Sequence, residues 1–321
     1  MGCSYKNTND YVEKTDFRLD TVITIRLYDG DEKQLEHCME MIKKYDDMFS
    51  NEQLNSDVTI VNESISNPMA VHSDTLEIME KALEYGKLSG GSFDVTIGAV
   101  SNLWDFHSDE AILPEEAAIS EAIKTVDYRQ VVINDNTIAL VENGSGSTFH
   151  TRLDLGGIAK GYIADKLRDY LMEEGVTSAS ISLGGNVYII GEKPDGNMFT
   201  VGIQKPFSDT STPACTLQVR DKSVVTSGVY QRYFKIGDKI YHHILDPKTG
   251  YPVDNGLYSV TIISDDSVDG DALSTMVFSM GLKKGMDYVE STPGIEAVFI
   301  TSDMALHPSS GMSEYNYQEV R

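Results

Sequence analysis

Apolar and polar residues follow two different periods in the N-terminal part of the chain. From Phe17 to Tyr28, β-branched and apolar residues alternate with polar ones, which is the two-residue period of a half-buried strand. Three later segments have the period of an amphipathic helix: Asp31 to Phe49, Asp74 to Leu88 and Pro114 to Thr125. This part of the chain is therefore predicted to be mainly helical after one strand.

The second half of the chain changes to short β-branched runs. Turn signals such as Pro194-Asp-Gly196 and Pro247-Lys-Thr-Gly250 separate them. The predicted strands are Ser178 to Leu183, Val187 to Gly191, Phe199 to Gln204, Thr216 to Arg220, Ser223 to Thr226, Tyr233 to Ile236 and Leu257 to Ile263. Because helices and strands are segregated and no long linker interrupts the chain, we predict an α+β fold in one domain over residues 16–321. A flexible polar tether is predicted at residues 1–15.

A glycine-rich segment in the middle of the chain carries the first candidate chemistry. Arg152 to Asp165, RLDLGGIAKGYIAD, is typical of a strand end, a tight turn and a helix start. Such a turn leaves backbone N–H groups unpaired at the helix N-terminus, where they can hold a phosphate. Asp154 stands at the strand end and Lys160 in the first helical turn. The G-G-x-x-x-G spacing matches neither a dinucleotide fingerprint nor a P-loop. The alternative is an ordinary strand–turn–helix with glycines for packing.

A second candidate cluster lies near the C-terminus, in a segment predicted as a helix from Asp271 to Gly281, with Gly281 as the residue that ends it. Asp271 and Thr275 are four residues apart, so their oxygens project from one helix face. A carboxylate and a hydroxyl, completed by a carbonyl and water, suit Mg²⁺. In the alternative, Asp271 favours the helix N-terminus and Thr275 bonds back to a backbone carbonyl.

Two adjacent histidines form the third candidate group. His242 and His243 face opposite ways if they lie in a strand, so at most one of them faces a given cleft. A histidine beside Asp246 can serve as a general base, because its ordinary pKa lies near neutrality. The alternative is a hairpin with surface histidines and an Asp-Pro turn.

Charge and cysteine content narrow the classes of partner. The 321 residues carry a formal net charge of −24, which argues against a nucleic-acid partner because such a partner needs a basic surface. A polyanionic ligand therefore needs local help from a metal, a lysine or a helix end. Cys38 lies in a helix-like pattern and is predicted to be a small buried residue, whereas Cys215 lies in a strand-like run. Neither has a CxxC partner, so no disulfide framework or zinc site is indicated.

Cys3 is a separate case because it follows Met-Gly and precedes a polar segment. The mature chain of a bacterial lipoprotein begins with cysteine, and one interpretation is that Met-Gly stands here in place of the hydrophobic signal that would precede it. No apolar run approaches the roughly 18–20 residues that span a bilayer. We therefore expect contact with a membrane only through a lipid on Cys3. The alternative is an incidental terminal cysteine.

Together these segments resemble one family, the ApbE flavin transferases, which act as FAD:protein FMN transferases. The resemblance runs from about Phe17 to about Met312, and its segments occur in the family's order. They are Leu19-Asp-Thr21, Phe49-Ser50, Ser56 to Asn62, Gly91-Ser-Phe-Asp-Val-Thr96, Leu103-Trp104, Asp154 to Gly161, Leu183-Gly-Gly-Asn186, Thr226-Ser-Gly228, His243 to Gly250 and Asp271 to Thr275. The resemblance implies an ApbE-like fold, related to the T-fold, with mixed sheets, packed helices and a central FAD cleft.

The resemblance also implies an activity and a set of site residues. The activity is Mg²⁺-dependent transfer of FMN from FAD to a threonine or serine of a target flavoprotein, with release of AMP. The metal is held by Asp271, Thr275 and the backbone carbonyl of Gly157, and the implied catalytic residues are His243, Asp271 and Lys160. The residues implied at the FAD are Leu19, Phe93, Asp94, Val95, Asp154, Lys160, Ser227, Gly228 and His243. Many members carry methionine where this chain has Leu19, and leucine preserves an apolar contact with the flavin.

Two other functions use the same residues. One is an Mg²⁺-dependent FAD pyrophosphatase that gives FMN and AMP, and the other is a non-catalytic FAD-binding protein. The Asp271 and Thr275 pair argues against the passive binder, which needs no metal. Because the family is commonly exported and lipid-anchored, we expect an extracytoplasmic protein anchored to the membrane through Cys3, with a target flavoprotein as its partner.

Overall fold

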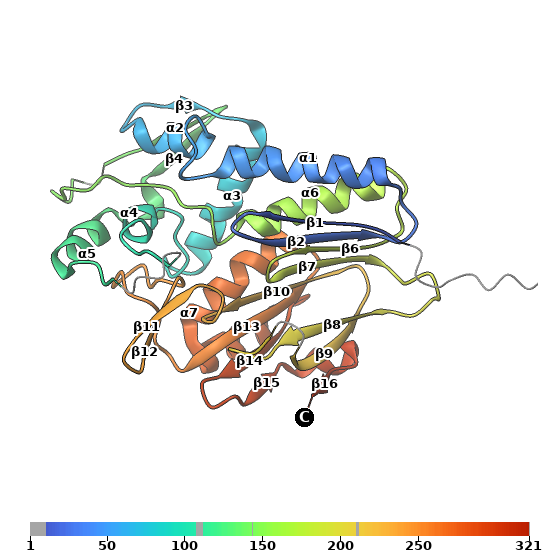
Figure 1. The fold of residues 1–321 in the computed structure, drawn as a ribbon. Coiled ribbons are helices and arrows are strands. Elements are labelled where there is room, and N and C mark those ends of the chain that lie inside the picture. Colours follow the sequence, from blue (N-terminus) through green and yellow to red (C-terminus); the bar gives the residue numbers. More distant parts are fainter. Residues whose placement is uncertain (1–10, 107–111, 143, 210–211, 321) are drawn as a thin grey trace, which may run out of the picture.

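The computed structural model describes residues 11–106, 112–142, 144–209 and 212–320. Its centre is an eight-stranded sheet in the order β1-β2-β6-β7-β10-β13-β14-β15, and each neighbouring pair is antiparallel (Figure 1). The strands are β1 (Val12–Arg18), β2 (Thr21–Leu27), β6 (Ser178–Leu183), β7 (Asn186–Gly191), β10 (Lys222–Gly228), β13 (Leu257–Ser264), β14 (Glu296–Thr301) and β15 (Leu306–Pro308). The antiparallel sheet with separate helices confirms the predicted α+β class.

The predicted first strand is in fact the tip and second arm of a hairpin. Leu19 and Asp20 form the turn between β1 and β2, and both have a positive φ, 53° and 56°. Two successive left-handed residues match the right-handed twist of the flanking strands, which is why such turns favour hairpins. The continuous pattern from Phe17 to Tyr28 hides this break because leucine is not a usual turn residue.

The predicted tether at residues 1–15 is wrong for its last part. Val12 to Thr15 belong to β1 and pair with Ile25, Arg26 and neighbours in β2. The strand lies at the sheet edge and most of its side chains are exposed, so it lacks the apolar alternation by which a strand is usually recognised. Residues 1–10, including Cys3, lie outside the described residues.

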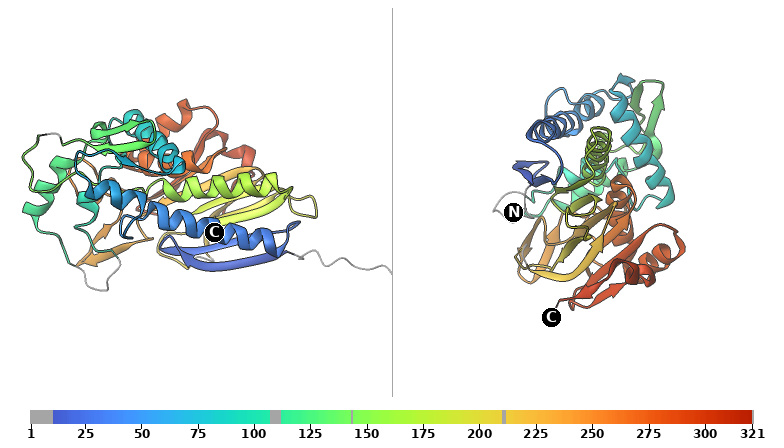
Figure 2. Two further views of the ribbon diagram at one scale, coloured as in Figure 1. Left: turned by 90° about the horizontal axis from the view of Figure 1, so that it is seen from above. Right: turned by 90° about the vertical axis from the view of Figure 1, so that its right-hand side faces the viewer.

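Helices cover one face of the sheet. The helices α1 (Glu32–Phe49), α6 (Ala159–Glu173) and α7 (Ser267–Ser291) pack there, as the view from above shows (Figure 2). Ile23 and Ile25 of β2 are fully buried in the same cluster as Cys38 and Leu167 from the helices. This confirms that Cys38 is a buried residue. Asp31 caps α1 through a reciprocal hydrogen bond with Gln34.

A small second sheet packs on the other face. It contains β8 (Phe199–Gln204), β9 (Pro213–Val219) and β16 (Gln318–Glu319), in the order β16-β9-β8. Its buried side chains, including Phe199 and Cys215, form one cluster with Ile189 and Val224 of the central sheet. Cys215 is therefore buried, and both Cys38 and Cys215 are free thiols.

The remaining elements flank these layers, and the last 3₁₀ turn packs with the second sheet. They are α2 (Asp57–Glu63), β3 (Met69–Ala70), α3 (Ser73–Leu88), α4 (Gly98–Ser101), α5 (Glu116–Ala122), the 3₁₀ turns Ile123–Thr125, Tyr128–Gln130 and Ser310–Tyr315, β4 (Val131–Asn134), β5 (Thr137–Leu140), and the hairpin of β11 (Tyr233–Ile236) and β12 (Lys239–His242). In the described part of the chain, no helix has both the length and the apolar character needed to cross a membrane.

The helix α7 begins earlier and ends later than predicted. It starts at Ser267 rather than Asp271 and continues to Ser291, with a break at Gly281, where φ is 75° and ψ is 169°. Gly281 therefore ends the first segment as predicted, because glycine tolerates a positive φ, but the chain resumes a helix immediately afterwards. The Asn255 side chain donates to the carbonyl oxygen of Phe278 at 2.6 Å, which satisfies a carbonyl that the break leaves without a helical partner.

Candidate functional site

The glycine-rich segment and the late aspartate meet where α6 and α7 cross. The backbone N–H of Gly161 donates to Oδ2 of Asp271 at 2.8 Å. The Nζ atom of Lys160 lies 3.9 Å from the other carboxylate oxygen, Oδ1. The prediction that these two distant segments share one place in the fold is confirmed. The contact brings a buried carboxylate to the N-terminal turn of α6, where free N–H groups favour negative charge.

The close approach of the two helices depends on Gly161. A Cβ atom at this position would lie 2.3 Å from the carbonyl oxygen of Ser267 and 2.7 Å from Cβ of Asp271. Any larger residue would therefore push α7 away from α6. The third glycine of the G-G-x-x-x-G spacing serves helix packing, as the alternative interpretation held, and this packing also delivers Asp271 to the turn.

Three residues with oxygen donors, Gly157, Asp271 and Thr275, lie near this crossing. The Gly161 N–H donates to Asp271 and is not used for the carbonyl of Gly157 four residues earlier, so that oxygen stays available to a ligand. A Cβ built on Gly157 would lie 3.8 Å from the Thr275 hydroxyl, which places the turn beside α7. One carboxylate, one hydroxyl and one carbonyl fit Mg²⁺, which takes few protein ligands and completes its octahedron with water and phosphate oxygens.

The same chemistry explains why these residues do not form a conventional metal cluster. Among the described residues, no group of three or more histidines, cysteines or acidic residues is arranged to hold a metal ion. A site with a single carboxylate would not form such a group. Neutral donors leave room for a substrate that brings its own negative charge, as a dinucleotide does.

Asp154 and Lys160 both point to the turn. One carboxylate oxygen of Asp154 accepts from the N–H of Gly156 at 2.8 Å, and the other accepts from the Ser101 hydroxyl at 2.7 Å. The ammonium of Lys160 donates to the Gly156 carbonyl at 3.2 Å. The two side chains thus bind the N–H and the carbonyl of the same residue, Gly156, which is exposed. Their predicted contacts with FAD remain predictions.

The loop of Phe93, Asp94 and Val95 contacts the glycine turn. The edge of the Phe93 ring would be 3.2 Å from a Cβ on Gly157, and the Val95 carbonyl accepts from the N–H of Asp154 at 2.8 Å. The carboxylate of Asp94 accepts from the N–H and hydroxyl of Thr96 and from the N–H of Tyr128. Burial raises the pKa of Asp94, and these hydrogen bonds oppose the rise. Its visible role is to fix the loop.

Asn62 is a support that sequence reasoning did not single out as a site residue. Its side-chain oxygen accepts from the N–H of Leu153 at 2.6 Å, and its amide donates to the Leu153 carbonyl at 3.1 Å. Asn62 is buried in α2, and its side chain binds both the backbone N–H and the carbonyl of Leu153, as a neighbouring strand would. The available signal was its place in the segment Ser56 to Asn62, which gives no indication of its contact.

Ser227 and Gly228 end β10 next to α7. The Ser227 hydroxyl lies 2.8 Å from the Ser274 hydroxyl and 3.2 Å from that of Thr275, so it belongs to the same cluster. A Cβ on Gly228 would lie 2.7 Å from the Tyr230 ring, so a larger residue at this position would clash with that ring.

Leu19 lies at the β1–β2 turn, and its neighbour Asp20 lies 3.9 Å from the Arg232 guanidinium.

The two histidines have different surroundings. His242 is buried, and its Nε2 lies 3.0 Å from the Val253 carbonyl while its Nδ1 faces the N–H of Ile244 at 3.3 Å. Both ring nitrogens are occupied in one neutral tautomer, assigned from these contacts, so His242 is structural. Burial lowers the pKa of His242 to about 4, which keeps it neutral.

His243 has one ring nitrogen left for chemistry. Its Nδ1 lies 3.3 Å from the Arg232 carbonyl, and if Nδ1 carries the proton of that hydrogen bond, the lone pair is on Nε2. Burial lowers the pKa of His243 to about 3, and the charges of Arg232 and Lys160 act in the same direction. The ring is therefore neutral near pH 7.

The structure favours the turn interpretation of Asp246 over a pairing with a histidine. The carboxylate of Asp246 accepts from the N–H of Lys248 at 2.9 Å and from the Thr249 hydroxyl at 3.3 Å. It closes the Asp-Pro-Lys-Thr-Gly turn, which is the usual use of an aspartate that begins a turn. The carbonyl of Gly250 at the end of this turn accepts from the Trp104 indole at 3.0 Å.

A cavity of about 760 Å³ lies elsewhere on the molecule. Its lining comes from the ends of β7 to β10 and the last 3₁₀ turn, and none of the predicted site residues lines it. Two of its basic residues are paired, Arg220 with Glu192 at 2.8 Å and Lys222 with Asp265. The converging oxygen donors at the α6–α7 crossing are the stronger indication of a reaction site.

Comparison with known proteins agrees with the geometry. The model of the ApbE family matches residues 19–299. A protein of Klebsiella pneumoniae (strain 342) named FAD:protein FMN transferase is 36% identical over 289 residues, which cover 90% of this chain and 88% of that protein. One from Treponema pallidum (strain Nichols), with the same name, is 34% identical and covers 87% of this chain and 80% of its own length.

A solved structure agrees as well. The crystal structure of an ApbE protein from Thermotoga maritima MSB8 superimposes with a TM-score of 0.86 at 31% identity, and the match covers 95% of this chain and 99% of that one. The family match, the related sequences and the fold all extend over nearly the whole molecule. This chain belongs to the ApbE family.

Proposed function

We propose that this protein transfers FMN from FAD to a threonine or serine hydroxyl of a target flavoprotein, with Mg²⁺ as cofactor and AMP as the second product. The observation that carries the proposal is the meeting of Asp271, Thr275, Gly157 and Lys160 at the first turn of α6. Relatives that match most of the chain are named FAD:protein FMN transferase, which supports the same reaction.

The residues present suit phosphoryl transfer, which is mainly a matter of positioning and charge neutralisation. Mg²⁺, when bound by Asp271, Thr275 and the Gly157 carbonyl, would supply positive charge against the phosphates of FAD. The Lys160 ammonium, 3.9 Å from Asp271, supplies a second positive charge. The backbone N–H groups of the glycine turn offer further donors at a helix N-terminus.

In the proposed reaction the acceptor hydroxyl oxygen bonds to the FMN-side phosphorus. The bond from that phosphorus to the bridging oxygen breaks, and AMP leaves with that oxygen. The proton of the hydroxyl passes to Nε2 of His243, the nitrogen that its contact with Arg232 leaves free. The lowered pKa keeps His243 neutral at the pH of the reaction, so the lone pair on Nε2 is not already protonated.

The test is to incubate the protein with FAD, Mg²⁺ and a candidate acceptor flavoprotein, and to analyse the protein and nucleotide products by mass spectrometry. Transfer predicts an acceptor that gains one FMN, with one AMP released for each FMN attached. Free FMN and AMP in equal amounts would indicate a pyrophosphatase instead. Unchanged bound FAD after Mg²⁺ addition would indicate a passive flavin-binding protein. EDTA and an acceptor whose target hydroxyl residue is replaced by alanine are the controls.

We also propose that Cys3 carries a lipid and that the protein acts outside the cytoplasm, attached to a membrane. The support is the position of Cys3 before a polar segment. Expression of the chain behind a lipoprotein export signal, with a radiolabelled fatty acid, tests this idea. The wild-type chain should be labelled and a Cys3→Ser variant should not, whereas equal labelling of both chains would refute the proposal.

A further inference from the structure

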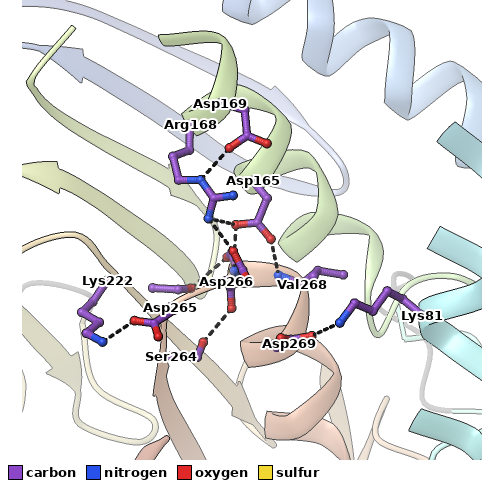
Figure 3. Close-up of polar contacts among 12 residues, drawn as sticks. Lys81, Asp165, Arg168, Asp169, Lys222, Ser264, Asp265, Asp266, Val268 and Asp269 are labelled. Atoms are coloured by element: carbon purple, nitrogen blue, oxygen red, sulfur yellow. Dashed lines mark hydrogen bonds and ion pairs between the residues drawn. The ribbon is translucent and has the colours of Figure 1, made fainter. Parts of the chain in front are cut away.

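The N-terminus of α7 is capped by a side chain from α6. The carboxylate of Asp165 accepts from the backbone N–H of Ser267 and from that of Val268, both at 2.8 Å (Figure 3). Asp165 is 8% exposed and lies in the interface between the two helices. These N–H groups belong to the first turn of α7 and have no partner within the helix, so Asp165 satisfies two donors that would otherwise be buried and unpaired.

The contact forms one half of a reciprocal arrangement. Asp271 of α7 accepts from the N–H of Gly161 in α6, while Asp165 of α6 accepts from N–H groups in α7. Gly161 and Asp165 are four residues apart, and so are Ser267 and Asp271, so each pair spans about one helical turn. The two helices therefore hold each other by a carboxylate at the partner's N-terminus, in one fixed register.

The local capping residue does not perform this role. Asp266 occupies the N-cap position, where aspartate is favoured, but its side chain makes no cap hydrogen bond. Its carboxylate instead lies 2.7 Å from Nη1 of Arg168, and the same nitrogen lies 3.0 Å from Asp165. Asp266 is thus paired with Arg168, and the N–H groups of α7 bind Asp165 instead (Figure 3).

The other acidic residues around the start of α7 are paired as well. Asp265 is bound by Lys222 of β10, and Asp269 lies 3.0 Å from Lys81 of α3. The first turn of α7 is thereby connected to three elements, α3, α6 and β10 (Figure 3). Pairing of these carboxylates leaves Asp271 as the one from this segment that faces the glycine turn.

We propose that Asp165 is a positioning residue for the metal ligands of α7. By fixing the first turn of α7 against α6, it sets the rotation of α7 that brings Asp271 and Thr275 to the Gly157 carbonyl. Asp165 itself touches neither ligand. The inference rests on the proposed function, because it assigns a role at the same metal site.

The proposal predicts a specific effect of Asp165→Asn. The amide has nearly the same shape but offers one acceptor oxygen, and its NH₂ group would face one of the two N–H donors. The first turn of α7 would lose its fixed orientation while Asp271 stays intact. Loss of a supporting hydrogen-bond partner around a metal site typically weakens metal affinity about 10–100-fold. We expect the Mg²⁺ concentration at half-saturation to rise about tenfold, with most of the maximal rate recovered at saturating Mg²⁺.

The experiment measures Mg²⁺ dependence in two ways. The first is the rate of FMN transfer against Mg²⁺ concentration, and the second is calorimetric titration of Mg²⁺ into the protein with bound FAD and no acceptor. Asp266→Asn is the matched control, since it removes the same charge from the N-cap position without removing a cap hydrogen bond. It should leave both Mg²⁺ midpoints unchanged. Thermal melts define a temperature at which every variant is folded.

A second pair of variants isolates the backbone donor. Ser267 is the first residue of α7, where proline is tolerated, and Ser267→Pro removes the N–H that binds Asp165. Ser267→Ala removes the same hydroxyl contacts with Ser223 and Asn186 but keeps that N–H. The proline variant should raise the Mg²⁺ midpoint above that of the alanine variant. This comparison remains decisive if Asp165→Asn cannot be obtained folded.

Several outcomes separate this inference from the proposed function. Equal Mg²⁺ midpoints for wild type and Asp165→Asn, or for the two Ser267 variants, would overturn the positioning role while transfer by the wild type still stands. A shift of the same size in Asp266→Asn would also overturn it. A wild type that binds Mg²⁺ and FAD without transferring FMN, while Asp165→Asn still shifts the calorimetric midpoint, would remove the proposed function and leave the positioning role.

Discussion

Replacement of Gly161 by alanine tests whether the α6–α7 crossing delivers the metal ligands. Elsewhere in a helix this change would stabilise a protein by roughly 0.5–1 kcal/mol, because glycine loses more backbone freedom on folding. At Gly161 the added methyl group would lie 2.3 Å from the Ser267 carbonyl oxygen and 2.7 Å from Cβ of Asp271. Both atoms belong to α7 and neither is the flexible end of a long side chain.

The size of the effect follows from these distances. An ordinary contact requires at least 3.4 Å, so α7 must move away from α6 by roughly 1 Å. Such overpacking typically costs about 1–3 kcal/mol, which outweighs the gain in helix propensity. The same displacement carries Asp271 away from Gly157, and a misplacement of about 1 Å can lower a rate about 100-fold. We therefore expect Gly161→Ala to be less stable and to transfer FMN about 100-fold more slowly.

Urea unfolding and the FMN-transfer assay measure the two effects separately. Gly285→Ala is the matched control, because Gly285 lies beyond the break in α7 and its added methyl group would meet the side chain and carbonyl of Val277 at 2.9 Å. This control should lose stability but keep a rate near that of the wild type. The reasoning is refuted if Gly161→Ala is as stable as the wild type and transfers FMN at the wild-type rate.

Three further predictions concern single residues. Asp271→Ala should lower the transfer rate about 100- to 1,000-fold and Lys160→Ala by less, since a loss of this kind costs about 2.7–4 kcal/mol; equal rates for Asp271→Ala and the wild type would contradict the metal assignment. Asn62→Ala should lower the free energy of unfolding by about 1–3 kcal/mol, because the N–H and carbonyl of Leu153 lose their partner; unchanged urea unfolding would contradict this. The lowered pKa of His242, about 4 against 6.5 when unfolded, stabilises the fold above pH 6.5, and this contribution is lost as the pH falls towards 4. When the pH is lowered from 7 to 5, the free energy of unfolding of the wild type should decrease by roughly 1–2 kcal/mol more than that of His242→Asn. An equal decrease in both proteins would count against burial as the cause.

The parts of the fold that sequence reasoning found are those with a local cause. The helix α1 follows from its apolar period and from Asp31 at its start, and both are properties of neighbouring residues. The meeting of Gly161 with Asp271 was predicted through the resemblance to a family, whereas the clash distances at Gly161 explain it physically. Gly161 allows close packing of α6 on α7, and the same contact places Asp271 at the candidate site. The two interpretations of this glycine therefore agree.

The parts that were missed depend on contacts between distant segments. The strand β1 has few buried side chains, so its residues after Tyr11 have the pattern of a tether until β2 pairs with them. The cap of α7 comes from Asp165, and nothing near Asp266 in the sequence indicates that Arg168 draws Asp266 away.

The most direct measurement is a crystal structure of the protein soaked with FAD and Mn²⁺, in which anomalous scattering locates the metal. Mn²⁺ accepts the same oxygen ligands as Mg²⁺. The account predicts one strong peak in contact with a carboxylate oxygen of Asp271, the Thr275 hydroxyl and the Gly157 carbonyl, at about 2.0–2.3 Å from each. A metal bound at the FAD phosphates without any of these three residues would contradict it.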